Sequence, residues 1–294
     1  MLSQPIVRKG VITVAGVGTR FLPATKALPK ELLPVLDKPV VQYIVEEMAA
    51  SGIEEIIFVT SQSKRAIEDH FERNPDFERF LKEKGKLDRI QSVIDLCDKV
   101  RFFATRQSIP LGNGHALLCA KEFIGDEPFA FSDGDSIIDA KVPAIKQLLS
   151  VYKKYEAPVI GVQRISDKQA MTQYGNVYGK ATKEKNTYRV SDFREKPKVE
   201  EVSPHGLIVG GMRYILTKDI WPLLEKQGSG KDGEIWLADA ANALAHKKPF
   251  YAYEYEGKYL DTGNKLALLK AAIHFALKDE TMKREIEELF THRT

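Results

Sequence analysis

A glycine-rich turn followed by two basic residues is the part of this sequence best suited to chemistry. A short apolar run, Gly10–Ala15, leads into Gly16 and Gly18, and Arg20 and Lys30 come soon after. Glycines let backbone N–H groups approach a ligand closely, and open α/β sheets bind ligands where a strand meets a loop. Because two cations follow, the turn is suited to a small anionic ligand.

Two common nucleotide-binding signatures do not describe this turn. It lacks the Gly-Lys-Ser/Thr ending of a Walker A loop, and Phe21 stands where a G-x-G-x-x-G fingerprint has its third glycine. Taken alone, two glycines are often only a tight connection, and Lys30 alone is more often a solvated surface lysine. Whether the turn and Lys30 bind a ligand must therefore be judged from the residues that follow them in the sequence.

The elements around the turn have the rhythm of a parallel sheet with helical crossovers. Gly10–Ala15 is a β-branched run typical of a buried strand. Apolar residues from Val40 to Met48 recur at three- and four-residue spacing, which predicts an amphipathic helix. Ile56–Thr60 predicts the next strand. Strand, helix and strand in succession predict an α/β fold.

The same alternation continues along the rest of the chain, and the second half is richer in strands. We predict strands at Val100–Thr105, Phe129–Ser132, Pro158–Gln163, Tyr188–Arg194, Leu207–Ile215 and Phe250–Tyr255. We predict helices at Ala116–Lys121, Ile145–Tyr152 and Lys278–Phe290, with polar loops at Lys180–Asn186 and Gly228–Gly233. No internal repeat or low-complexity linker divides the sequence, so a single domain is expected.

The composition excludes several classes of protein. Lys and Arg number 44 against 41 Asp and Glu, and this near balance argues against a nucleic-acid-binding protein. Cys97 and Cys119 lie apart without metal-ligand spacing, so a reducing cytoplasm is the expected location. No stretch approaches the ~20 apolar residues that span a bilayer, so no membrane association is expected.

The glycine turn is part of a longer sequence motif that indicates a family. Gly16 to Pro39 matches G-x-G-T-R-x-x-P-x-T-x-x-x-P-K-x-L-L-P-V-x-x-K-P without a gap, which resembles the N-terminal signature of the sugar-1-phosphate nucleotidyltransferases. Phe21–Glu47, Arg106-Gln107 and Pro110–Ala120 are similar to the UTP–glucose-1-phosphate uridylyltransferase branch of that family. The resemblance extends through most of the chain, to Asp261.

The resemblance implies a fold and a reaction. The expected fold is a Rossmann-like, mixed and mostly parallel central sheet flanked by helices. The single domain, 1–294, would comprise a nucleotide-binding half (8–140), a β-rich sugar-binding half (141–264) and a C-terminal helical tail (265–294). The expected reaction transfers a uridylyl group from UTP to glucose 1-phosphate, giving UDP-glucose and pyrophosphate. It needs no protein nucleophile, only alignment and charge neutralisation assisted by Mg²⁺.

The resemblance also implies roles for individual residues. Arg20 and Lys30 would contact the triphosphate, since arginine binds phosphate bidentately and lysine acts as a point charge. The implied nucleotide-binding residues are Ala15, Gly16, Gly18, Thr19, Glu31, Gln107, Gly112 and Gly114. The Gln107 amide offers one donor and one acceptor group for the uracil edge. For Glu31, a surface carboxylate is an equally good interpretation.

Two further motifs match the family. Glu195-Lys196-Pro197, preceded by Tyr174-Gly175, resembles its sugar-binding segment, so Gly175, Glu195 and Lys196 would bind the sugar phosphate. Asp135 and Asp261 align with its metal-binding aspartates and both follow strands, which favours a shared Mg²⁺ site. Because the local sequence is Ser-Asp-Gly-Asp-Ser, Asp133 is the alternative to Asp135.

Some positions depart from the family pattern. Val14 replaces a small residue before the glycine turn, Met212 replaces a glycine, and Trp236 and Ala238 interrupt a common motif. These changes put the base preference and the identity of the sugar in doubt.

Alternative functions follow from these departures. They are a dTTP-dependent thymidylyltransferase and a catalytically weak regulatory protein that binds nucleotide sugars, although the latter class loses the basic residue that is Arg20 here. A helix-rich scaffold or binding protein would leave the turn unexplained. The family forms dimers or tetramers, so a homodimer or homotetramer is expected, with no nucleic-acid partner.

Overall fold

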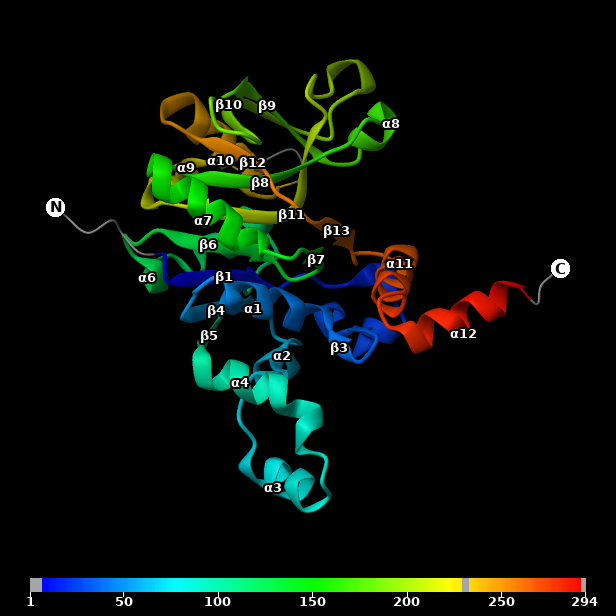
Figure 1. Cartoon of the computed structure of the whole chain (residues 1–294). Helices are drawn as coiled ribbons and strands as arrows, with labels where there is room; N and C mark the ends of the chain where they lie inside the picture. The colour runs from blue at the N-terminus through cyan, green and yellow to red at the C-terminus, as the bar shows by residue number, and fades with distance from the viewer. Residues whose placement is uncertain (1–6, 229–232, 292–294) are drawn as a thin grey trace.

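A mixed β-sheet forms the centre of the molecule. The computed structural model describes residues 7–228 and 233–291. Across the sheet the strands lie in the order β5 (Arg101–Arg106), β4 (Glu55–Thr60), β1 (Lys9–Thr13), β6 (Phe129–Asp133), β11 (Leu207–Leu216), β8 (Val159–Arg164), β12 (Tyr251–Glu254), β10 (Thr187–Glu195) and β9 (Gly175–Ala181). Strands β5, β4, β1 and β6 are parallel to one another, whereas β11 and β10 run antiparallel to the strands beside them. The expected mixed α/β fold is confirmed (Figure 1).

Helices cover both faces of this sheet. Their bounds are α1 (Val40–Ala50), α2 (Arg65–His70), α3 (Pro75–Glu83), α4 (Gln91–Lys99), α5 (Asn113–Leu118), α6 (Lys121–Ile124), α7 (Ala144–Tyr155), α8 (Lys168–Met171), α9 (Trp221–Lys226), α10 (Leu237–Lys247), α11 (Lys265–Ala276) and α12 (Glu280–Thr291). None of these helices is long and apolar enough to cross a membrane.

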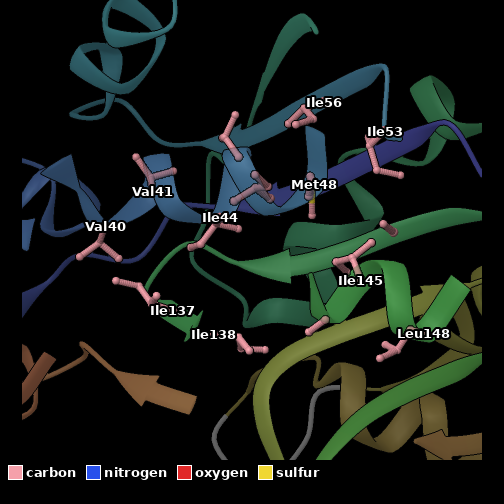
Figure 2. Packing of buried hydrophobic residues seen from close by; sticks show 14 of the residues in the cluster. Val40, Val41, Ile44, Met48, Ile53, Ile56, Ile137, Ile138, Ile145 and Leu148 are labelled. Carbon is pink, nitrogen blue, oxygen red and sulfur yellow. The ribbon is translucent and has the colours of Figure 1, made fainter. Parts of the chain in front are cut away.

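Alternation along the strands gives each face its own apolar layer. In β4, Ile56 and Phe58 pack with residues of α1 and α7 on one face, whereas Ile57 and Val59 pack with α5, α9 and α10 on the other. The α1 residues predicted to form an apolar stripe are buried in the first layer, where Ile44 and Met48 approach Ile145 and Leu148 of α7 (Figure 2). A central strand buried on both faces reads as a continuous apolar run, as predicted.

A separate two-stranded ribbon joins distant parts of the sequence. Strand β7 (Ser136–Asp139) pairs antiparallel with β13 (Lys258–Asp261), and Asp261 lies opposite Ser136. A second short ribbon pairs β2 (Pro34–Val35) with β3 (Lys38–Pro39). The β7–β13 ribbon brings the two predicted metal-binding residues to one place. Asp135 directly precedes β7, and Asp261 is the last residue of β13.

Several elements differ from the predictions. The expected helix at Ala116–Lys121 is two helices, α5 and α6, because the Ala120 N–H bonds three residues back to the Leu117 carbonyl and tightens the last turn of α5. Strand β1 ends at Thr13, although the Val14 N–H still bonds to Val59 of β4. Strand β9 occupies part of the expected Lys180–Asn186 loop, and helices α2 to α4 lie in a region without a prediction. The expected Gly228–Gly233 loop falls largely outside the described residues.

Candidate active site

The glycine turn lies directly over the side chain of Lys30. Gly18 has a φ of 72°, a conformation that favours glycine, and its carbonyl accepts a 2.7 Å hydrogen bond from the Thr25 hydroxyl. A Cβ atom added at Gly16 would lie 3.6 Å from Lys30 Nζ, and one added at Gly18 would lie 3.3 Å from Lys30 Cβ. Gly18 is therefore required by its positive φ and by the close approach of Lys30, whereas Gly16 lies at ordinary contact distance above the end of the lysine side chain. Thr19 and Arg20 follow at the surface, while Ala15 is buried.

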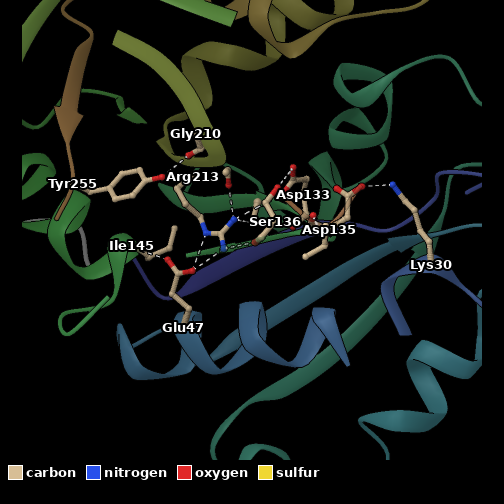
Figure 3. A network of polar contacts seen from close by, with 12 residues as sticks. Lys30, Glu47, Asp133, Asp135, Ser136, Ile145, Gly210, Arg213 and Tyr255 are labelled. Atoms are coloured by element: carbon tan, nitrogen blue, oxygen red, sulfur yellow. Dashed lines mark hydrogen bonds and ion pairs between the residues drawn. The ribbon is translucent and has the colours of Figure 1, made fainter. Parts of the chain in front are cut away.

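The Lys30 ammonium group forms an ion pair with the Asp135 carboxylate (Figure 3). Side-chain exposures of 21% and 23% leave the pair partly open to solvent. Burial alone would lower the pKa of Lys30, but Asp135 and Glu31 outweigh it and the pKa is raised. Lys30 therefore carries its positive charge at neutral pH and stands next to a carboxylate that could exchange it for another cation.

The β7–β13 ribbon places Asp261 beside Asp135. The Thr262 hydroxyl donates a 2.6 Å hydrogen bond to the Asp135 carbonyl, and the Gly263 N–H donates one of 2.8 Å to Asp261 Oδ1. A Cβ atom added at Gly263 would lie 3.1 Å from Asp261 Oδ1, 3.5 Å from Arg20 Nη1 and 3.7 Å from Asp135 Oδ2. Arg20 and Lys30 thus lie around one small space with Asp135 and Asp261, which are far from them in the sequence.

Asp133 faces the interior more than this space. Its Oδ2 accepts a 2.5 Å hydrogen bond from the Ser136 hydroxyl, and its Oδ1 is buried without a hydrogen-bond partner among the described residues. Burial and the neighbouring Asp135 raise the pKa of Asp133 to about 7. The contact between Lys30 and Asp135 makes Asp135 the better of the two candidates for binding an external cation.

A cavity of about 450 Å³ opens beside the glycine turn. The loops that follow strands β1, β4 and β5 line it with Ala15, Val17, Ser61, Gln62, Ser63, Arg106, Gln107, Ser108 and Pro110. These are the carboxyl ends of three adjacent parallel strands, which is where open α/β sheets bind ligands. The cavity is adjacent to the turn, so a ligand with a base and a phosphate chain could occupy both.

Gln107 lies at the edge of this cavity, and its side chain is hydrogen-bonded to the loop that follows it. Its Nε2 donates a 2.9 Å hydrogen bond to the Gly112 carbonyl and lies 3.1 Å from His115 Nδ1. Cβ atoms added at Gly112 and Gly114 would lie 2.6 Å and 2.8 Å from the Ile235 carbonyl oxygen. The two glycines therefore allow close packing against Ile235, and their contact with a nucleotide stays a prediction, as does that of Gln107.

Glu31 is not a surface carboxylate, so that interpretation is wrong. Its side chain is 1% exposed, and its Oε2 lies 2.6 Å from the Nζ of Lys64, which is 3% exposed. Burial raises the pKa of Glu31 in spite of the two neighbouring lysines, Lys64 and Lys30. Lys64 follows the loop after β4 and has no signal in the sequence that would predict this pairing.

The predicted sugar-phosphate residues form a group of their own. Gly175 lies opposite Glu195 in the β9–β10 pair, and a Cβ atom at Gly175 would lie 2.9 Å from Glu195 Oε2. Lys196 has a positive φ of 43°, and its Nζ lies 4.0 Å from Glu195 Oε1. Among the described residues, no hydrogen bond or ion pair joins this group to Asp135 or Asp261. Their binding of a sugar phosphate stays a prediction.

Arg213 is the residue that the sequence interpretation left without a role. It is fully buried in β11 and forms an ion pair with Glu47 of α1 at 2.7 Å. Its other hydrogen bonds reach Ser132, Ser136 and the Gly211 carbonyl, around the loop that carries Asp133 and Asp135 (Figure 3). The sequence does contain one indication of this role. Arg213 is a single charge within the apolar run Leu207–Leu216, and a charge buried in such a strand must be paired.

The comparison with known proteins agrees with this geometry. A family model described as nucleotidyl transferase matches residues 9–277. The chain belongs to this family.

Related nucleotidyl transferases are similar along nearly their whole length. The chain is 48% identical to UTP–glucose-1-phosphate uridylyltransferase 2 of Staphylococcus saprophyticus over 282 residues, which cover 96% of both chains. It is 46% identical to UTP–glucose-1-phosphate uridylyltransferase of Staphylococcus epidermidis over 281 residues, again 96% of both chains. Among solved structures, a UTP-bound UGPase from Acinetobacter baumannii superposes with a TM-score of 0.87 at 35% identity, covering 98% of this chain and 100% of that one.

Proposed function

We propose that the chain transfers a uridylyl group from UTP to glucose 1-phosphate, releasing pyrophosphate and UDP-glucose. The observation that carries this proposal is the convergence of Arg20, Asp135 and Asp261 within 4 Å of one point beside Gly263. Relatives named for this reaction cover 96% of the chain at 46–48% identity. A structure named as UDP-glucose pyrophosphorylase complexed with UDP-glucose superposes with a TM-score of 0.85 at 34% identity.

The residues of the site act by alignment and charge. An oxygen of the sugar phosphate attacks the α-phosphorus of UTP, a new P–O bond forms, and the bond to the bridging oxygen breaks as pyrophosphate leaves. Lys30, held beneath the glycine turn, and Arg20, at its exposed end, neutralise the phosphates and orient them. The backbone N–H groups of Gly16 and Gly18 approach the phosphate chain without side chains in the way. Preorganised charges of this kind lower the barrier without a covalent intermediate.

Asp135 and Asp261 are the residues we propose as ligands for Mg²⁺. Among the described residues, no three acidic, histidine or cysteine side chains cluster to bind a metal alone. Two carboxylates nevertheless suit Mg²⁺, which commonly takes one or two together with phosphate oxygens and water. The missing side chain at Gly263 leaves space between them. When bound there, the ion would neutralise charge on the phosphates. Asp135 would then release Lys30 toward the nucleotide.

The cavity beside Gln107 is the proposed base pocket. The Gln107 Nε2 is already bonded to Gly112, so the Oε1 atom is the group left to accept from the N3–H of uracil. Thymine presents the same edge and adds only a methyl group, so the pocket would have to discriminate by shape. Val17 is an exposed aliphatic side chain of this lining that could contact the added methyl group.

A pyrophosphate-release assay tests the proposal. Purified protein with Mg²⁺ is supplied with UTP, dTTP, CTP, ATP or GTP against glucose, galactose, mannose and N-acetylglucosamine 1-phosphates. We expect the highest kcat/KM with UTP and glucose 1-phosphate. A higher value with dTTP would instead make the chain a thymidylyltransferase. Binding of UDP-glucose without turnover of any pair would identify a regulatory binding protein and contradict the proposal.

We further propose that the chain assembles as a homodimer or homotetramer through α11 and α12. Leu266, Leu269 and Leu277 are 59%, 55% and 42% exposed, and Met282 of α12 is 43% exposed. Helix α12 projects away from the sheet (Figure 1). Exposed apolar patches of this kind commonly mark interfaces. Light scattering coupled to size-exclusion chromatography checks this, and Leu269→Glu should shift the mass toward that of a monomer. A monomeric native chain would contradict it.

We propose a cytoplasmic location. Cys97 and Cys119 are both free thiols, the state that a reducing compartment maintains. Cell fractionation with an antibody to the chain checks this, and recovery of the protein outside the cytoplasm would contradict it.

A further inference from the structure

Arg213 is a charged side chain with no exposed surface, so all its hydrogen-bonding capacity must be used inside the protein. Its Nε and Nη2 both donate to Glu47 Oε2, at 3.0 and 2.7 Å. Its Nη1 donates to the Ser132 hydroxyl at 2.7 Å, and its Nη2 also donates to the Ser136 carbonyl at 2.9 Å. A rigid guanidinium with these partners fixes several segments at once.

Two of these partners lie at the two ends of the Asp133-Gly134-Asp135 turn. Ser132 ends the buried part of β6, and Ser136 begins β7 (Figure 3). The turn has little freedom of its own, because a Cβ atom at Gly134 would lie 2.5 Å from Val14 Cγ1. Arg213 therefore holds both ends of a loop that is also pressed against the chain after β1.

The anchor of this arrangement is Glu47. Its Oε2 accepts the hydrogen bonds from the Arg213 guanidinium. Its Oε1 accepts a 3.0 Å hydrogen bond from the Ile145 N–H at the start of α7. Glu47 belongs to α1, so two long helices of one apolar layer determine where the guanidinium lies (Figure 2). Helices α1 and α7 are thereby connected through Glu47 and Arg213 to the Asp133–Asp135 turn.

We propose that Arg213 is a positioning residue for the Asp135 carboxylate, and that it sets the affinity of the site for the divalent cation without touching that cation. This inference rests on the proposed function, in which Asp135 is a metal ligand. By holding Ser132 and Ser136, Arg213 directs Asp135 toward Lys30 and Gly263. Through the Gly211 carbonyl it also holds the irregular segment of β11, where Gly211 and Met212 have positive φ angles of 71° and 46°.

A merely structural ion pair makes a different prediction from a positioning residue. Buried ion pairs can often be replaced by uncharged side chains of similar volume without loss of stability, whereas removal of one partner alone destabilises strongly. The double variant Glu47→Gln/Arg213→Met removes both charges of this pair, and the amide oxygen of residue 47 can still accept from Ile145. Of the described carboxylates, Asp133, whose Oδ1 lies 3.7 Å from Arg213 Nη1, is the one that loses a neighbouring cation. This variant should recover the stability that Arg213→Met loses alone, but not the contacts to Ser132 and Ser136.

The experiment measures Mn²⁺ binding by water-proton relaxation in protein saturated with UDP-glucose, together with thermal unfolding of each variant. Arg213→Lys and the double variant should bind Mn²⁺ about 10- to 100-fold more weakly, the usual effect of losing a group that orients a ligand. The double variant should unfold near the native temperature. The matched control is Arg164→Lys on β8, which alters a partly exposed ion pair with Glu254 of β12 and should leave Mn²⁺ affinity unchanged.

The outcomes separate this inference from the proposed function. If Asp135→Asn binds Mn²⁺ as tightly as the native chain, the metal site itself is wrong. If Asp135→Asn loses Mn²⁺ while both folded Arg213 variants retain native affinity, the metal site stands and the positioning role is refuted. Loss of Mn²⁺ affinity in Arg164→Lys as well would refute it too, because the effect would then not be specific to the Ser132–Ser136 segment.

Discussion

The buried pair of Glu31 and Lys64 makes a quantitative prediction about stability. The two side chains are 1% and 3% exposed, and their charged atoms lie 2.6 Å apart. Glu31→Gln keeps the shape of the side chain but leaves a buried ammonium group without its carboxylate. Loss of one partner of a buried pair costs about 3–5 kcal/mol. At roughly 2 °C per kcal/mol for a chain of this size, the unfolding midpoint should fall by about 6–10 °C.

The pH dependence of stability is a second test of the pair. Burial already raises the pKa of Glu31, and removal of Lys64 would raise it further. A carboxyl whose pKa is higher in the folded chain binds more protons when folded, so stability increases as pH falls and is lost as pH rises past that pKa. Lys64→Met should therefore differ less from the native chain at pH 5 than at pH 8. The native Glu31 carboxyl is itself uncharged once it takes up a proton, as Gln is, so the deficit of Glu31→Gln should also shrink as pH falls.

Urea denaturation followed by tryptophan fluorescence, with the double variant as control, completes the test. Glu31→Gln/Lys64→Met removes both charges and should restore stability to within about 1 kcal/mol of the native value. The reasoning fails if Glu31→Gln unfolds like the native chain while its KM for UTP rises tenfold or more. That result would mean that the carboxylate binds the nucleotide and that Lys64 is not its main partner.

Four other substitutions test the site and its surroundings. Arg20→Ala and Asp135→Ala should each lower kcat by about 10²–10³ in a pyrophosphate-release assay without lowering the unfolding midpoint, and a native rate in either would remove that residue from the mechanism. Gly263→Ala places a methyl group 3.1 Å from Asp261 Oδ1 and should lower kcat about tenfold at unchanged stability; unaltered kinetics would show that the space is not used. Burial alone would raise the pKa of Asp139, but hydrogen bonds from His274 of α11 and from Lys278 lower it. Asp139→Asn should lower the free energy of unfolding by about 1 kcal/mol at pH 7. This deficit should vanish as pH falls through the lowered pKa, because the protonated aspartate of the native chain has lost the same ionic interactions. A deficit in denaturation curves that stays constant with pH would contradict this.

The predictable parts of the site are those that the local sequence determines. The glycine turn, Arg20 and Lys30 lie within one short segment, and the turn geometry follows from residues that need positive φ or the absence of a side chain. The strands β1, β4 and β6 are predictable because burial on both faces requires continuous apolar runs. Convergence of Asp135 and Asp261 could be expected from their positions beside strands, although not the ribbon that joins them.

The unpredicted parts depend on contacts between distant residues. Lys64 and Arg213 are basic residues that the sequence shows only as charges, and their partners Glu31 and Glu47 lie 33 and 166 positions away. Strand β9 escaped prediction because its glycines, including Gly175 and Gly179, are poor strand formers. Gly179 is nevertheless required, since a Cβ atom there would lie 2.4 Å from the Arg189 carbonyl oxygen.

The pairing of β7 with β13 also governs how this architecture can change over evolutionary time. The chain leaves the ribbon at Asp139 and returns to the same end at Lys258, so insertions in this excursion that leave Arg213 in place need not disturb the distance between the two carboxylates. A slip of the ribbon by one position, in contrast, would turn Asp261 to the opposite side. Segments of this excursion that do not contact the Asp133–Asp135 turn can therefore change without moving the two carboxylates.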